Sequence, residues 1–296
     1  MRYWLASLLL TLATASGAQE QVDDPTFDVR VPEPQLARQA PKLLFDEAHF
    51  NVHRADKTYR AFVDLVRNDG ARVSVNHARF TSKSLSSYRL LVIAGALGAA
   101  LEDETQAKRP AFTPDEIKAV KQWVARGGGL LLLTDHEPVS SASADLAKAF
   151  GVSSSGLVVL DREHRFPNFY PTNVLATPQN GLLKTHPLSC GVQNVLIFGG
   201  QSLTLPEKAI VVGIGSSART PDDPAKPTGN AQVGAFHFGR GRVVIAGDMG
   251  MLSAQRMVDK DQSNPWGMNV PGIDNRRLVL NVVRWLAHRP TGCERH

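Results

Sequence analysis

The sequence is poor in several features that would each point to a class of protein. It has only two cysteines, no apolar run of membrane-spanning length after residue 18, no internal repeat and no linker that marks a second domain. Basic residues are interspersed with acidic ones, and no basic stripe carries aromatic side chains. These absences argue against nucleic acid as a partner, against a membrane span in the mature chain and against a multidomain chain.

The first 18 residues have the pattern of a secretory signal peptide. Arg2 precedes an apolar run from Trp4 to Ala13, and small residues follow at Ser16 and Ala18. The run is too short to cross a bilayer, and no cysteine follows that could carry a lipid anchor. We therefore expect a periplasmic or secreted protein, whose formal net charge falls from +5 to +4 when Arg2 is removed (32 basic minus 28 acidic residues).

The two cysteines leave two interpretations open. In an oxidising compartment, Cys190 and Cys293 could form a disulfide. Alternatively, Cys190 is a buried thiol and Cys293 lies on a frayed tail, residues 291–296. The spacing of the two residues does not decide between these interpretations.

Secondary-structure patterns predict one α/β domain over residues 42–290. Residues 19–41 hold four prolines and no periodicity, which predicts an extended leader ahead of it. The segments KLLFDEAH, ARVSVNHARF, YRLLVIAGA and LLLLT have the pattern of strands, with helical segments between most of them. Continuously apolar strands are typical of a parallel sheet that is buried on both faces. The fold class is therefore a flavodoxin-like, mostly parallel sheet with helices on both sides.

Helix boundaries and late strands refine this prediction. The segment FTPDEIKAVKQWVARGGG has Thr113 as N-cap, Pro114 in first position, Glu116 completing a capping box and Gly127 as its stop. DNRRLVLNVVRWLAHRP is an amphipathic helix that Pro290 ends. AIVVGIGSS, QVGAFHF and GRVVIAGD follow one another without a helix, so we expect them to add antiparallel strands to an edge of the same sheet.

Ionisable side chains follow three of the predicted strands. Because ligands bind beyond the carboxyl ends of strands in open α/β sheets, we expect these side chains to lie at one rim. They are Asp46, Glu47 and His49 after the first strand, Asp135 and His136 after LLLLT, and Asp248 after VVIAG; the polar but uncharged Asn51 also follows the first strand. Each also has a structural interpretation, since acids after strands often cap turns and histidines are often hydrogen-bonded without a chemical role.

Three further segments could wall such a site. The segment from Asp161 to Tyr170 mixes charges with aromatic residues, and the segment from Asp259 to Asn269 contains Trp266 among polar groups. Gln201 is flanked by small residues and could present its amide to a substrate. The alternative is that the two long segments are ordinary surface loops and that Gln201 lies in a tight turn.

Several of these motifs together resemble a known family. FDEAHFN, FTPDEIKAVKQWVARGGGLLLLTDH, THPLSCGV, GRGRVVIAGDMGMLSAQ and DNRRLVLNVVRWLA look like a bacterial family of domains of unknown function that is related to gliding-motility and intraflagellar-transport proteins. The resemblance covers residues 42–287 and implies a fold like that of class I glutamine amidotransferases and trehalose-utilisation-type domains. It implies no reaction.

The amidotransferase resemblance fails at the residue that would carry the chemistry. Those enzymes place a nucleophilic cysteine in a glycine-flanked turn after the strand equivalent to LLLLT. This chain has Thr134, Asp135, His136, Glu137 and Pro138 there, without a thiol. Cys190 follows a different kind of segment and does not replace the missing thiol. We therefore expect no thiol-dependent glutaminase activity.

Two functional hypotheses from different classes remain. In the first, the protein is a hydrolase acting on a glycan- or peptide-derived substrate, with Glu47 or Asp135 orienting His136 as a general base. Zinc or manganese could bind to Asp46, His49 and Asp248 if those side chains meet, and Asn51, Gln201 and Trp266 would contact the substrate. In the second, the protein is a non-catalytic module that binds a carbohydrate or an envelope protein, with the acids as hydrogen-bond acceptors.

Overall fold

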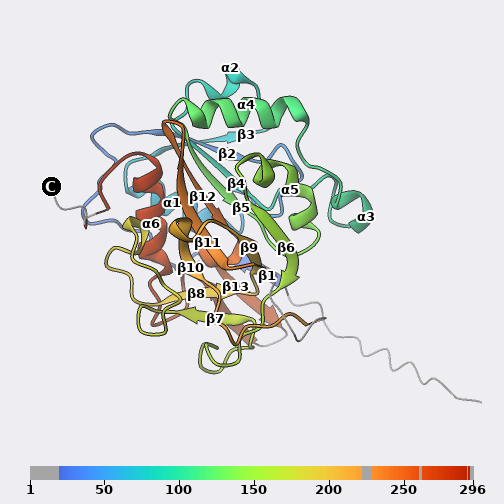
Figure 1. The fold of residues 1–296 in the computed structure, drawn as a ribbon. Coiled ribbons are helices and arrows are strands. Elements are labelled where there is room, and N and C mark those ends of the chain that lie inside the picture. The colour runs from blue at the N-terminus through green and yellow to red at the C-terminus, as the bar shows by residue number, and fades with distance from the viewer. Residues whose placement is uncertain (1–19, 222–228, 260–261, 292, 294–296) are drawn as a thin grey trace, which may run out of the picture.

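A nine-stranded mixed sheet forms the centre of the protein (Figure 1). The structure is a computed structural model that describes residues 20–221, 229–259, 262–291 and 293, so the predicted signal peptide lies outside the described residues. The strands follow the order β3-β2-β4-β5-β12-β11-β9-β6, and β10 pairs with β11. Their bounds are β2 Lys42–Asp46, β3 Arg72–Asn76, β4 Leu90–Ala94, β5 Gly129–Leu133, β6 Ser153–Val158, β9 Gln201–Thr204, β10 Ile210–Gly213, β11 Ala231–Phe238 and β12 Gly241–Ala246.

The first half of the sheet is parallel, as the apolar strands predict. β2 pairs in parallel with β3 and β4, β4 with β5, and β5 with β12. Counted along the chain, these five strands have the order 2-1-3-4-5, which is the flavodoxin arrangement. Every residue of β4 and β5 is buried, which explains their unbroken apolar sequences. The predicted fold class is confirmed.

The second half of the sheet differs in one respect from the prediction. β11 and β12 form a hairpin, with Phe238 opposite Gly241 and Gly239 at a positive φ of 57° in its turn. β10, β9 and β6 then extend the sheet with antiparallel pairings. The expectation that all three late strands are antiparallel additions was wrong for β12, which lies beside β5 and pairs with it in parallel because β11 takes the outer position.

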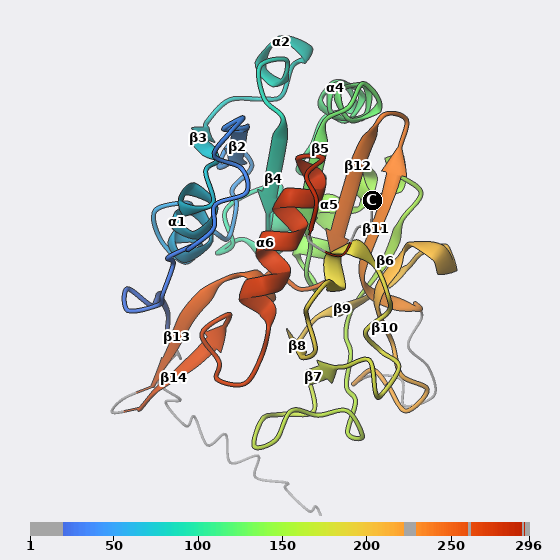
Figure 2. The same cartoon turned by 90° about the vertical axis from the view of Figure 1, so that its left-hand side faces the viewer.

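Helices cover both faces of the sheet (Figure 2). α1 (Arg60–Asn68) and α6 (Asn275–Leu286) pack on one face, where apolar side chains such as Leu43, Phe45 and Leu131 point. α2 (Ser82–Leu85), α4 (Pro114–Ala125) and α5 (Val139–Ala149) contribute to the cluster on the other face. α3 (Glu104–Ala107) belongs to a separate small cluster, in which Ala107 packs with residues such as Leu97 and Val139. The alternation of side chains along each strand separates the two cores.

The capping signals around α4 form as predicted. Thr113 Oγ1 accepts a hydrogen bond from the amide of Glu116, and the Glu116 carboxylate accepts one from the amide of Thr113. Pro114 occupies the first turn, and Gly127 follows the helix at a positive φ of 121°. Glu116 is also buried, with 3% of its surface exposed, which a capping residue on a solvent-facing helix end does not require. Its carboxylate also bonds to His49 and to the amide of Phe80.

The segment expected to be an extended leader is packed against the domain. β1 (Glu20–Asp23) pairs antiparallel with β13 (Ala254–Asp259), which pairs with β14 (Gln262–Gly267) in a separate three-stranded sheet. Leu36 is completely buried in the core. The sequence reasoning missed this sheet because β1 is short and β14 contains Pro265, which favours an edge strand. The segment from Asp259 to Asn269 is therefore largely a hairpin arm and not a free loop.

The C-terminal helix is enclosed on nearly all sides. Leu278, Val282, Trp285 and Leu286 are buried, and so are the polar Asn281 and Arg284. Arg284 makes a two-pronged ion pair with the buried Asp69, with nitrogen–oxygen distances of 2.7 and 2.8 Å. The remaining short elements are β7 (Asn173–Ala176) with β8 (Val195–Phe198), and the 3-10 turns η1 (Pro187–Ser189), η2 (Glu207–Ala209) and η3 (Gly250–Leu252).

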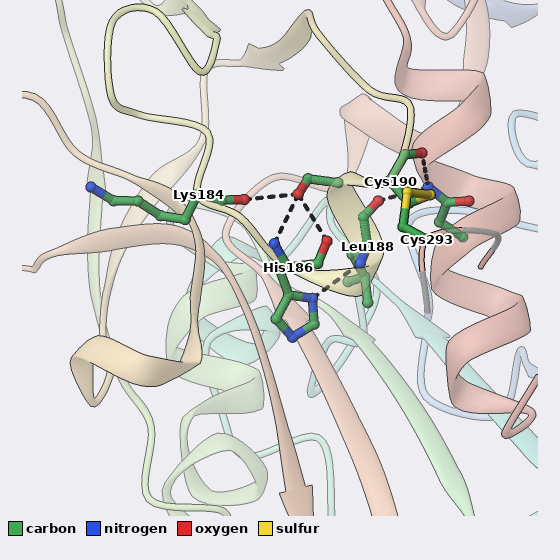
Figure 3. Close-up of a disulfide and its surroundings, with 7 residues drawn as sticks. Lys184, His186, Leu188, Cys190 and Cys293 are labelled. Carbon is green, nitrogen blue, oxygen red and sulfur yellow. Dashed lines mark hydrogen bonds between the residues drawn. A yellow bond between two sulfur atoms is a disulfide. The ribbon is translucent and has the colours of Figure 1, made fainter. Parts of the chain in front are cut away.

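A disulfide joins Cys190 to Cys293, so the first of the two interpretations of the cysteines holds (Figure 3). The Cα atoms lie 5.6 Å apart, and the bridge spans 103 positions of sequence. The turn that carries Cys190 is fixed independently: His186 Nδ1 accepts a hydrogen bond from the amide of Leu188, and Asn281 donates to the carbonyl of Cys190. Of the helices in the described ranges, none has the length and apolar character that a membrane span requires.

We predict that the disulfide stabilises the fold through the unfolded state. Closing a loop of this length lowers the entropy of the unfolded chain, which corresponds to about 4.7 kcal/mol. Replacing Cys190→Ala and Cys293→Ala together should lower the free energy of unfolding by that amount in urea titrations. Dithiothreitol should destabilise the wild type and leave the double variant unchanged. A wild-type midpoint that is insensitive to reductant would contradict the prediction.

Candidate functional site

The register of the central strands places two acids side by side. Ala246 of β12 is paired with Leu133 of β5, and Asp248 and Asp135 each follow by two residues. Both carboxyl groups are buried, and both are bound to the same turn: Asp135 Oδ2 accepts the amide of Met249 at 3.2 Å, while Asp248 Oδ1 accepts the amide of Gly250 at 2.7 Å. The predicted convergence of these two strand ends is confirmed.

Asp248 is fully engaged in holding the backbone. Its other oxygen accepts the amide of Phe198 at 2.6 Å, and Oδ1 also accepts that of Met251 at 3.2 Å. Burial raises the pKa of Asp248, and the neighbouring charge of Asp135 raises it further. With its oxygens directed at three backbone amides, Asp248 ties β8 to the turn after β12.

A cleft of about 340 Å³ opens beside this pair. Its walls are mainly apolar, and the Trp266 ring lies 4.8 Å from that of Phe198 between ring centroids. Polar groups from the ends of β2 and β5 and from β1 complete the lining. The residues are Gln21, Val52, His53, Leu101, Asp135, His136, Glu137, Pro138, Val139, Phe198, Met249, Gly250 and Trp266. The small sheet thus delivers Trp266 and Gln21 to the carboxyl edge of the main sheet.

Asp135 and His136 are the polar pair at this cleft. Asp135 Oδ1 accepts the amide of His136 at 2.8 Å and lies 3.5 Å from Nε2 of the same residue. The His136 side chain is 50% exposed, and its Nδ1 lies 3.0 Å from the carbonyl oxygen of Glu137. Burial raises the pKa of Asp135 to about 7, against the lowering effect of hydrogen bonds from Met249 and His136. A carboxyl group at the cleft therefore changes its protonation near neutral pH.

His53 is a cleft residue that the sequence reasoning missed. Its ring is 2% exposed, Nδ1 lies 2.8 Å from the Thr58 hydroxyl, and the ring packs on Tyr59 at 4.8 Å. Burial lowers the pKa of His53 to about 4, so the imidazole is neutral at physiological pH. Its position two residues after Asn51, in the same strand-end segment, was the signal that could have found it.

A second cluster, Asp46, His49 and Glu116, occupies the rim next to β2. His49 Nδ1 donates to Asp46 Oδ2 at 2.7 Å, and Nε2 donates to Glu116 Oε1 at 2.9 Å. The ring also packs between Phe80 and Phe112, with centroids 4.9 and 4.6 Å away. Because both nitrogens donate to carboxylates, His49 is an imidazolium that links the end of β2 to the first turn of α4.

The charges of this cluster are matched internally. Burial lowers the pKa of His49, but hydrogen bonds and charge attraction from Asp46 and Glu116 outweigh it, so the pKa is raised overall. Burial raises the pKa of Glu116, yet its hydrogen bonds with Thr113, His49 and Phe80 lower it overall. Asp46 also accepts bonds from Asn51 at 3.2 Å and Asn76 at 2.9 Å. The cluster fills the switch point between β2 and β4, where flavodoxin-like folds usually bind ligands.

The predicted metal set does not assemble. Asp46 and His49 are bonded to each other, whereas Asp248 lies at the other end of the rim, against the amides of β8 and η3. Among the described residues there is no group of three or more acidic, histidine or cysteine side chains that could hold a metal ion. The set fails because each side chain is already used within the fold.

Three further predicted residues have structural partners in place of a ligand. Glu47 Oε1 accepts the amide of Ala55 at 2.8 Å, and its other oxygen pairs with Arg54 at 3.1 Å. Asn51 binds Asp46 and the amide of His49. Gln201 is completely buried and uses both ends of its amide, and its partners are Thr134, the carbonyl of Asp135, Ser140 and the amide of Gly156.

The candidate site therefore contains Asp135, His136 and Trp266 from the predicted set, with His53 added. The Asp161–Tyr170 segment does not line the cleft. Within that segment, His164 Nδ1 donates to the buried Asp161 at 2.7 Å, and the Ser217 hydroxyl donates to the same carboxylate at 2.8 Å. Since the hydroxyl lies on the carboxylate side of the ring, this trio lacks the order of a nucleophilic triad.

Comparison with known proteins gives structural similarity without sequence similarity. No protein-family model and no curated protein matches the chain. The mmIFT52 N-terminal domain has a TM-score of 0.61 and 18% identity, and the match covers 86% of this chain and 99% of that one. A protein described as ThuA-like from Parabacteroides merdae has a TM-score of 0.48 at 14% identity (86% and 92% covered), and another from Bacteroides uniformis has 0.43 at 12% (89% and 95%). The first match shows a shared fold.

We predict that His49 is a structural residue whose removal destabilises the fold. His49→Gln leaves two buried carboxylates without their shared cation, which should lower the free energy of unfolding by about 3 kcal/mol. The contribution of His49 is complete below its ordinary pKa of 6.5 and is lost as the pH rises through its raised folded value. That of Glu116 is present above 4.5 and is lost as the pH falls through its lowered value.

The measurement is urea unfolding at a series of pH values. The difference between wild type and His49→Gln should be largest from about pH 4.5 to about pH 6.5 and should shrink on both sides. His77→Gln, at an exposed position, is the matched control and should leave stability unchanged. A difference that does not vary with pH would show that His49 is not held as an imidazolium.

Proposed function

We propose that this protein is a non-catalytic binding module whose cleft takes a small hydroxylated ring ligand, such as a sugar unit of a glycan. The observation that carries the proposal is the composition of the cleft, in which an aromatic wall faces a few polar groups. Sugar rings present apolar C–H faces that pack on aromatic side chains, and hydroxyl groups that bind to polar ones.

The aromatic wall is formed by two side chains held in fixed positions. Trp266 packs against Phe198 and against the backbone at Gly250, where an added Cβ would lie 3.0 Å from the indole nitrogen. Gly250 therefore allows the indole to lie close to the turn after β12. A rigid ring of this kind loses little conformational entropy when a ligand packs on it.

The polar groups at the cleft suit a neutral, hydroxylated ligand. Asp135 offers a carboxyl group that can donate or accept near neutral pH, and His136 is exposed enough to reorient. His53 contributes a neutral ring and Gln21 an amide. No unpaired cation lines this cleft among the described residues, so a phosphate or sulfate group would find no counter-charge there.

The distribution of charge at the rim supports binding over catalysis. An active site that used the acids and histidines together would need them free to exchange protons with a substrate. Asp46, His49 and Glu116 satisfy one another, and Asp248 is held by backbone amides. Of the rim acids and histidines predicted from the sequence, Asp135 and His136 line the cleft in the described part of the chain, next to His53 and Glu137.

We also propose that the protein is periplasmic or secreted and that it belongs to the domain family related to gliding-motility and intraflagellar-transport proteins. The disulfide supports the location, since such bonds persist in oxidising compartments. The structural match to the mmIFT52 N-terminal domain supports the family, and the turn from Thr134 to Pro138 sets this chain apart from thiol-dependent amidotransferases.

A second candidate function is hydrolysis by the Asp135–His136 pair. One observation favours it: burial brings the pKa of Asp135 to about 7, which suits a general acid or base at neutral pH. On this reading Asp135 exchanges a proton with the substrate or a water, and the nearby His136 shares or stabilises the charge.

We predict that Trp266 dominates the affinity for a glycan. A glycan array identifies ligands of the wild type, and isothermal titration with the best-bound soluble oligosaccharide gives the dissociation constant. Trp266→Ala removes the apolar surface under the sugar ring and should weaken binding at least about tenfold. Tyr170→Ala is the control, because this aromatic side chain is 76% exposed and lies outside the cleft. Failure of the wild type to retain any glycan would refute the proposal.

The two candidate functions are separated by a turnover assay. On the binding proposal, purified wild type hydrolyses no member of a panel of chromogenic glycosides, esters and peptides above the buffer rate. On the hydrolase alternative, turnover is present and falls at least about 100-fold in Asp135→Asn and His136→Ala. Tyr170→Ala serves again as the control and should keep the wild-type rate in that case. Turnover with this pattern would replace the first proposal by the second.

A further inference from the structure

The edge of the sheet opposite the cleft gathers arginines that are far apart in the sequence. β4, β5 and β12 begin at this edge, and α4, which lies across it, and α6, which runs along the strands, both end there (Figures 1 and 2). Arg89 precedes β4, Arg126 caps the C-terminus of α4, Arg240 lies in the β11–β12 hairpin and Arg289 follows α6. Basic residues that are interspersed in sequence are therefore clustered in space.

In the part of the chain that the structure describes, these four guanidinium groups have no carboxylate partner. Within the described ranges, none of them takes part in a salt bridge, in contrast to Arg284, which is paired with Asp69. The positive charges of the cluster repel one another. Burial lowers the pKa of Arg89, and the charge of Arg289 lowers it further. Burial likewise lowers the pKa of His288 to about 4, with a further contribution from Arg89. Mutual repulsion of this kind is relieved when an anion binds.

The helix ends explain only part of the cluster. The C-terminus of a helix carries about half a negative charge, so arginines are favourable there. Two helix ends supply about one negative charge against four positive ones. The helix dipoles therefore do not neutralise these four guanidinium groups, and uncompensated positive charge attracts anions from solution.

A hollow of about 290 Å³ lies within this edge and gives the cluster a defined place for a ligand. Arg89 and Arg126 line it, together with the hydroxyl-bearing Ser82 and Ser86. Trp123 packs flat against its floor, because Gly128 has no side chain: an added Cβ would lie 2.5 Å from the indole ring. The indole is fixed by a hydrogen bond from its nitrogen to the carbonyl of Tyr88 at 3.2 Å. The hollow thus combines a rigid floor with two guanidinium groups that form no salt bridge to any described residue.

We propose that this hollow binds the oxyanion of a phosphate group. A guanidinium group presents paired N–H donors whose spacing matches two oxygens of a phosphate, and such charge-assisted bonds are among the strongest in proteins. The phosphate can come from a free phosphate ion or from an anionic lipid headgroup, and both share this chemistry. The site is separate from the cleft, at the other end of the strands, so it does not depend on the function proposed there.

The first experiment measures binding of inorganic phosphate to the full chain. Thermal unfolding is followed in sodium phosphate and in sodium chloride at equal ionic strength. Phosphate should raise the melting temperature of the wild type above the chloride value. In Arg89→Gln/Arg126→Gln the apparent affinity should fall at least about tenfold. Arg126→Gln alone changes an exposed side chain, so its fold is retained, and it should show an intermediate loss.

A matched control separates this site from the overall charge. Arg38→Gln/Arg162→Gln removes the same two charges at exposed positions elsewhere and should bind phosphate as the wild type does. Equal losses in the two double variants would overturn the proposal, because the effect would then come from net charge alone. An equal response of the wild type to phosphate and chloride would count against binding of the free ion.

The second experiment identifies the source of the phosphate. Vesicles of phosphatidylcholine with and without phosphatidylglycerol are sedimented with each protein. Retention on the phosphatidylglycerol vesicles that is lost in Arg89→Gln/Arg126→Gln, and kept in the control, indicates a lipid headgroup. Binding of inorganic phosphate without vesicle retention indicates a soluble ligand. If neither probe binds in an Arg89- and Arg126-dependent manner, the proposal is wrong.

Discussion

The parallel pairing of β5 between β4 and β12 is the constraint on which the rest of the molecule depends. β4 and β5 are buried on both faces and apolar throughout, and β12 is apolar apart from Arg242 near its start, so polar groups lie at the strand ends. The register aligns Leu133 with both Ala94 and Ala246, so the residues beyond these positions emerge at one level. The cleft forms where the segments that follow β2, β5 and β12 meet the small sheet at that level.

Acidic residues at these strand ends mainly stabilise the turns that leave the sheet. A buried carboxylate is costly unless donors or a cation surround it, and the chain provides them locally. Asp248 has backbone amides, and Asp46 and Glu116 share His49. Because these three acids are satisfied within the fold, Asp135 is the buried acid that remains beside the cleft. Burial raises its pKa. The same arrangement that makes the rim rigid limits the chemistry that it can perform.

Sequence patterns predicted the features that depend on local spacing. The cap of α4, the apolar β4 and β5, and the placement of Asp135, His136 and Trp266 near one another follow from such patterns and from the strand-end rule. The second partner of Glu116 lies 67 positions away, and the four partners of Gln201 come from three elements, so neither could be seen in the sequence. β1 was missed because its pairing partner, β13, lies more than 200 residues later.

The first described strand lies beside the cleft, and this position determines how a molecule tethered through that end would be oriented. β1 is the first described element, and Gln21 within it lines the cleft. A tether attached ahead of residue 20 would therefore hold the mouth of the cleft near its point of attachment, and the arginine-lined edge would face outward. A fusion or an immobilisation tag at that end could obstruct ligand access, whereas the beginnings of β4, β5 and β12 would stay unhindered.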